Sequence, residues 1–124
     1  MIKKVINIYD YWKVIVYYNI DYNLFHLIEK DLYNINCKDY QINSIYNNMI
    51  NKKAKAVTIS SIDFETSIVL FNNHKSYLDY INSIVHEAEH IKQAMLNAYN
   101  VEDFGEAPAY TISYIASQML KFLL

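Results

Sequence analysis

The sequence has 124 residues, of which 53% are hydrophobic and 19% are charged, and its formal net charge is −2. This length suits one domain with one core, and this hydrophobic content excludes an intrinsically disordered chain. A charge so close to neutral argues against a nucleic-acid-binding tract or a polybasic membrane patch. We therefore predict a single domain over residues 1–124 that binds neither nucleic acid nor membrane.

Cys37 is the only cysteine, which excludes an internal disulfide and a cysteine-based zinc cluster. The opening segment MIKKVINIYD lacks the long apolar run and the cleavage site of a signal peptide, and no stretch is long enough to span a bilayer. We expect a protein kept in the cytoplasm of the cell that makes it, or packed into a phage virion. The abundance of Ile, Asn, Lys and Tyr, with 13 tyrosines, is typical of AT-rich genomes such as those of phages and low-GC bacteria.

The first part of the chain predicts two strands followed by two helices. Residues 5–20 alternate in the manner of β-strands, with one strongly apolar parity and one that is more polar and rich in tyrosine. A turn near Asp10 or Lys13 would divide them into a hairpin. Asp21 is a candidate N-cap, and helically spaced apolar residues follow it. A second amphipathic helix is expected over 39–53.

The second part of the chain predicts two more strands and two more helices. Short strands are expected over 54–61 and 66–71, and a long helix over 76–97. Gly105 and Pro108 then interrupt the chain, and a last helix runs to the C-terminus with the proline in its first turn. This order predicts an α+β fold, in which a short and mostly antiparallel sheet packs on helices.

The segment HEAEH, residues 86–90, lies within the long helix and is the main candidate for chemistry. His86 and His90 are four residues apart, so both imidazoles leave one helix face and can hold one zinc ion. Glu87 lies a quarter-turn away, in the position of a general base that activates water. The helix phase agrees, because the apolar residues gather on the opposite side: Ile81, Ile84, Ala88, Ile91, Met95 and Ala98.

A catalytic zinc ion needs a third protein ligand and an open position for water. Glu106 is the best candidate, because it follows His90 by 16 residues (106 − 90) and opens the last helix, which can pack beside the motif helix. Glu102 and Asp103 are nearby alternatives. Tyr110 falls one turn after Glu106, so its hydroxyl is a candidate donor to a developing oxyanion.

The pattern His86-Glu87-x-x-His90 followed by Glu106 resembles the zincin superfamily of metallopeptidases, in its gluzincin-like branch. The resemblance implies that these two histidines and Glu106 bind zinc, and that Glu87 activates water to hydrolyse a peptide bond. It also implies that an edge strand before the motif helix, here 66–71, binds an extended peptide or protein substrate by strand addition. The last third of the chain, with GEAPAYTISYI, is similar to a group of small phage and bacterial proteins with an HExxH helix and a GExPAY-type turn.

Each of these site residues also has a purely structural interpretation. The polar side of the motif helix can be a solvated face held by local side-chain pairs. Glu106 can be a carboxylate favoured by the helix dipole, and Tyr110 a packing residue. His26 and His74 fit no ligand spacing, and we expect them at the surface or as helix caps.

A structural role is the main alternative to an enzyme. The small size and the many tyrosines are typical of a phage virion or assembly protein, for example a tail or head–tail connector component that contacts other phage proteins through aromatic side chains. Such a protein could keep a zincin-like fold with a vestigial or structural metal site. An inhibitor or effector of a host protein is a third possibility.

Overall fold

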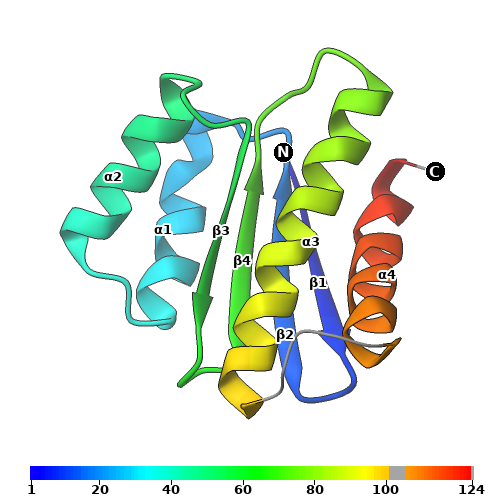
Figure 1. The fold of residues 1–124 in the computed structure, drawn as a ribbon. Coiled ribbons are helices and arrows are strands. Elements are labelled where there is room, and N and C mark those ends of the chain that lie inside the picture. Colours follow the sequence, from blue (N-terminus) through cyan, green and yellow to red (C-terminus); the bar gives the residue numbers. More distant parts are fainter. Residues whose placement is uncertain (101–105, 124) are drawn as a thin grey trace.

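Four strands form one mixed sheet with helices on both faces (Figure 1). The structure is a computed structural model that describes residues 1–100 and 106–123, without the side chain of Glu106. The strand order is β1-β2-β4-β3; β1 pairs antiparallel with β2, β2 parallel with β4, and β4 antiparallel with β3. The predicted α+β class is confirmed. The sheet is mixed because the chain crosses over through two helices and β3 before it enters β4.

The predicted hairpin is confirmed, with strands β1 (Ile2–Ile8) and β2 (Trp12–Tyr18). Its turn lies at Tyr9 and Asp10, whose φ angles of 51° and 64° are left-handed. Two successive left-handed residues match the right-handed twist of the strands they join, which is why hairpins favour such turns.

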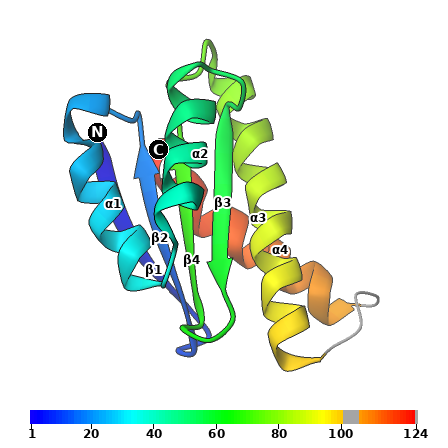
Figure 2. The ribbon, with the colours of Figure 1, turned by 90° about the vertical axis from the view of Figure 1, so that its left-hand side faces the viewer.

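One face of the sheet is covered by α1 (Phe25–Asn34) and α2 (Asp39–Ile50). A short 3-10 turn (Tyr22–Leu24) leads into α1, and the Asp21 carboxylate caps it by accepting a hydrogen bond from the Asn23 amide over 3.0 Å. The expected N-cap is thus confirmed. Figure 2 shows these two helices on one side of the sheet and the two helices that follow later in the chain on the other.

The other face is covered by α3 (Tyr77–Tyr99) and α4 (Glu106–Leu120), and a short 3-10 turn (Lys121–Leu123) follows α4 (Figures 1 and 2). Ser76 caps α3, since its hydroxyl accepts a hydrogen bond from the Asp79 amide. Within the described residues, no helix is both long and apolar enough to cross a bilayer.

Because helices cover both faces, β2 is buried on both sides. Trp12, Val14 and their neighbours of the same parity pack under α3 and α4. Ile15 and Tyr17, of the other parity, pack under α1 and α2. The expectation of a polar second face is therefore wrong for β2, although β1 does expose polar side chains on that parity.

The prediction that residues 66–71 form an edge strand is also wrong. They form β4 (Thr66–Phe71), which lies between β2 and β3, and all six of its residues are buried. The edge on this side of the sheet is β3 (Ala56–Ser61). The unbroken apolar run from Ile68 to Phe71 is the signal of a strand buried on both faces.

Candidate functional site

The two histidines of the motif lie on the exposed side of α3 and face each other. Their Nε2 atoms are 3.2 Å apart, and the two rings are nearly perpendicular, at 82°. Two nitrogens bound to one zinc ion at about 2.0–2.1 Å in tetrahedral geometry lie about 3.3 Å apart. The spacing of His86 and His90 therefore fits two ligands of a single zinc ion.

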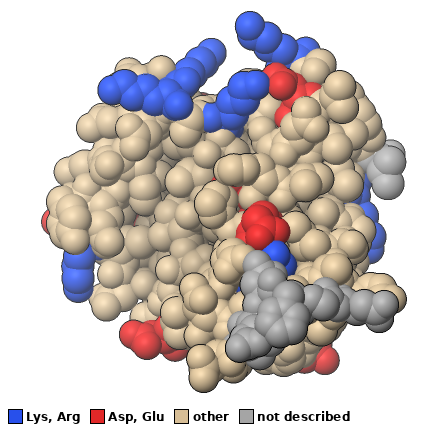
Figure 3. Space-filling model, in the orientation of Figure 1, with Lys and Arg blue, Asp and Glu red and all other residues tan. Residues whose placement is uncertain are grey.

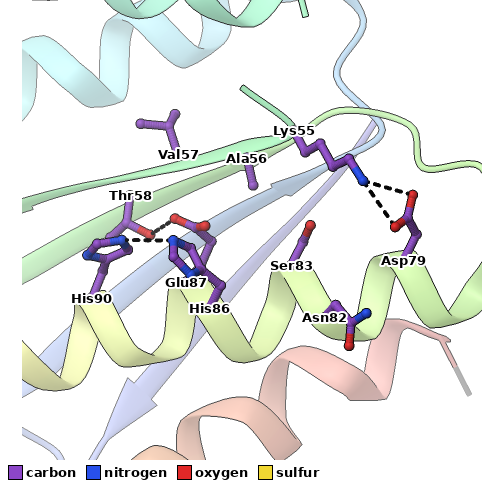
Figure 4. Close-up of a pocket in the computed structure, with 10 residues that line it drawn as sticks. All are labelled: Lys55, Ala56, Val57, Thr58, Asp79, Asn82, Ser83, His86, Glu87 and His90. Carbon is purple, nitrogen blue, oxygen red and sulfur yellow. Dashed lines mark hydrogen bonds and ion pairs between the residues drawn. The ribbon is translucent and has the colours of Figure 1, made fainter. Parts of the chain in front are cut away.

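Glu87 points toward the sheet, beside the two histidines in the same pocket, and its side chain is 4% exposed. One carboxylate oxygen, Oε1, accepts a hydrogen bond from the Thr58 hydroxyl over 2.9 Å. Thr58 belongs to β3, so this bond ties the motif helix to the edge strand (Figure 4). Sequence reasoning missed Thr58, because pairing between residues 29 positions apart leaves no local pattern.

These side chains line a pocket of about 640 Å³ between α3 and β3. That volume lies within the usual range for ligand sites, about 300–1,000 Å³. Figure 4 shows the two histidines and Glu87 at one end, the Lys55–Asp79 ion pair at the other, and Ser83 between them. The lining is completed by other residues of the strand side and of α3: Ala56, Val57, Thr58 and Asn82.

His74 and His26 do not join this pair as ligands. Nδ1 of His74 donates to the Asn72 carbonyl oxygen over 2.7 Å, and its Nε2 shares a hydrogen bond with the Ser83 hydroxyl, also over 2.7 Å. Both nitrogens of this half-buried ring are thus used within the fold. His26 is exposed on α1, on the opposite face of the sheet.

The third ligand remains a prediction. Glu106 is the first residue of α4, but its side chain lies outside the described residues, as do Glu102 and Asp103 entirely. In the part of the chain that the structure describes, no group of three or more His, Cys, Asp or Glu side chains is arranged to hold a metal ion.

Tyr110 lies in a different hollow from the histidine pair. Its side chain is 66% exposed and lines a depression of about 380 Å³ with Tyr9, Tyr11 and Tyr99. The start of α4, the end of α3 and the β1–β2 turn surround this depression. The structure therefore brings His86, Glu87 and His90 together, but leaves Tyr110 out of their pocket.

Comparisons with protein-family models, with curated proteins and with solved structures found no match to this chain. The functional interpretation therefore depends on the geometry of the pocket and on the HExxH pattern.

Proposed function

We propose that this chain is a zinc-dependent metallopeptidase that hydrolyses peptide bonds in the pocket between α3 and β3. The observation that carries this proposal is the 3.2 Å separation of the His86 and His90 Nε2 atoms, beside the carboxylate of Glu87. Glu106 is proposed as the third ligand. Bound zinc would act as a Lewis acid that polarises a peptide carbonyl and lowers the pKa of water.

The proton transfers are assigned to Glu87. Its Oε1 accepts the hydrogen bond from Thr58, which orients the carboxylate and leaves Oε2 to accept a proton from the attacking water. The same carboxyl group then returns the proton to the amide nitrogen that leaves. Because the side chain is 4% exposed, bulk water does not compete for that oxygen.

Substrate binding is assigned to β3 in place of residues 66–71. β3 has β4 as its partner on one side and lies at the end of the strand order, so its outer backbone groups can pair with an extended peptide. Ala56, Val57 and Thr58 of this strand line the pocket. A peptide added to β3 would therefore pass directly over the histidine pair.

Zinc content and peptide cleavage test the proposal together. We expect protein purified without chelator to bind one zinc ion, and His86→Ala to lose it. Glu87→Gln should keep the zinc but lose about 10²-fold or more in cleavage rate, because the general base is gone. Glu29→Gln, which changes a glutamate of α1 on the far face, is the matched control. Failure to bind zinc, or undiminished cleavage by Glu87→Gln, would contradict the proposal.

We propose as the second candidate a virion or assembly protein, because five exposed tyrosines gather around the depression that Tyr110 lines. Besides Tyr110, four of them pair as rings, with centroids 5.5 Å apart for Tyr9 and Tyr114 and 5.2 Å apart for Tyr11 and Tyr99. Exposed aromatic clusters of this kind are typical of protein interfaces. Mass spectrometry of purified phage particles tests this role, and absence of the chain from particles would exclude it.

A further inference from the structure

A second hollow, lined by three lysines, adjoins the end of the pocket where Lys55 pairs with Asp79. It has a volume of about 280 Å³, and it shares Lys55 and Asp79 with the pocket of the histidine pair. Its walls come from the α2–β3 loop and the β4–α3 loop, which meet at the same end of the molecule. The residues that line it are Lys52, Lys55, Asn72, Asn73, His74, Lys75 and Asp79.

This hollow is positive although the chain as a whole carries a formal charge of −2. Three lysines and one aspartate line it, which gives +3 − 1 = +2 with the histidine neutral. Lys55 is paired with Asp79 over 3.0 Å. The side chains of Lys52 and Lys75 are exposed and make no hydrogen bond or ion pair with another described residue, so their ammonium groups are available to a ligand. Figure 3 shows lysines together along the upper edge of this face, above a largely uncharged surface.

The start of α3 adds to the positive electrostatic potential in this hollow. The helix begins at Tyr77, directly after Lys75 and the Ser76 cap, and a helix N-terminus carries a partial positive charge. The negative charge of Asp79 offsets part of this positive potential, but its carboxylate is already paired with Lys55. A carboxylate is the peptide group that such a site favours.

The spacing between this hollow and the histidines suits an extended peptide. Asp79 and His86 are seven positions apart on α3 (86 − 79), which corresponds to about 10 Å of helix. An extended chain rises about 3.3 Å per residue, so about three residues cover that distance. β3 runs from Ala56, which directly follows Lys55, toward Ser61. A peptide paired antiparallel with β3 would run in the opposite direction, so its C-terminal end would point toward the lysines.

We propose that the pocket selects peptides with a carboxylate about three residues beyond the cleaved bond on the C-terminal side, bound by Lys52 and Lys75. The carboxylate is either an Asp or Glu side chain or the free C-terminus of the peptide. This inference rests on the proposed peptidase function. It goes further by naming the substrate class and the residues that determine it.

Binding to the zinc-loaded Glu87→Gln protein tests the selection without turnover. Three fluorescently labelled, alanine-rich peptides serve as probes: one with a free C-terminus, one amidated with an internal glutamate, and one amidated and neutral. We expect at least one acidic peptide to bind about tenfold tighter than the neutral one at low salt, as two exposed ion pairs allow, and the difference to shrink at high salt. Comparing the two acidic peptides shows which carboxylate is used.

The same measurement on lysine variants locates the effect. Lys52→Gln/Lys75→Gln should remove the preference for acidic peptides, while Lys4→Gln/Lys30→Gln, which removes equal charge from exposed positions on β1 and α1, should keep it. Equal binding of acidic and neutral peptides, or a preference unchanged in Lys52→Gln/Lys75→Gln, would overturn the inference. Cleavage by the wild-type protein is scored separately. Acidic peptides that bind selectively but are never cleaved would refute the peptidase and leave the carboxylate site standing.

Discussion

Thr58 Oγ1 lies 2.9 Å from Glu87 Oε1, so a hydroxyl of the edge strand holds the carboxylate of the motif helix. This single bond joins the two sides of the pocket at the residue to which we assign proton transfer. Thr58 is thus a positioning residue for Glu87.

Thr58→Val should lower the free energy of unfolding by about 1–3 kcal/mol, because the variant leaves a buried carboxylate without its donor. Urea denaturation measures the change. Thr58→Ser keeps the hydroxyl and should restore most of the loss. In the Glu87→Leu background, which removes the carboxylate, Thr58→Val should cost clearly less, as expected for coupled neighbours. Equal costs in both backgrounds would show that the bond contributes nothing.

Glu106→Ala should weaken zinc binding by roughly a hundredfold or more, because loss of even an outer partner of a metal ligand typically costs 10- to 100-fold. Competition with a chromogenic chelator measures the affinity. Glu102→Ala and Asp103→Ala test the two alternative ligands in the same assay. If one of these variants loses zinc while Glu106→Ala retains it, the third ligand is reassigned to that residue.

The loss of folding stability at alkaline pH should depend on Tyr80. Burial raises the pKa of Tyr80 to about 12, whereas a tyrosine in an unfolded chain titrates near about 10. Between these values the unfolded state loses its proton first, so the stability that Tyr80 contributes is complete below pH about 10 and is lost as the pH rises toward about 12.

Tyr80→Phe should therefore lose about 1 kcal/mol at neutral pH, where its bond to Asn19 is missing, and show a shallower decline above pH about 10. Urea unfolding at a series of pH values compares the two proteins. Tyr40→Phe is the control, because Tyr40 is 73% exposed. A decline of the same slope in wild type and Tyr80→Phe would show that this hydroxyl is not responsible.

The core beneath α1 should be sensitive to truncation. Ile28 is 0% exposed and packs against the sheet, whereas its neighbour Leu27 is 46% exposed. Ile28→Ala should cost about 2–5 kcal/mol of unfolding free energy, because it removes buried methyl groups and leaves a cavity. Leu27→Ala should change stability by much less. Chemical denaturation measures both, and similar losses would contradict the packing of α1 on this face.

The sequence by itself determined the local features of this protein. The alternation in the first strands predicted the hairpin, with a turn near Asp10 or Lys13 of which the structure shows the first, and Asp21 was found as a cap. Helical periodicity placed His86 and His90 on one face of α3, because residues four apart on a helix lie on the same side. All of these features depend on residues within a few positions of one another.

Only the tertiary structure decided how distant segments meet. It placed β4 inside the sheet and β3 at its edge, which moved the proposed substrate strand to residues that sequence reasoning had not chosen. It also brought Thr58 to Glu87, gathered Lys52 and Lys75 beside the pocket, and put Tyr110 in another hollow. Strand order and loop proximity arise from packing between segments far apart in the chain, and such contacts leave no periodic signal in the sequence.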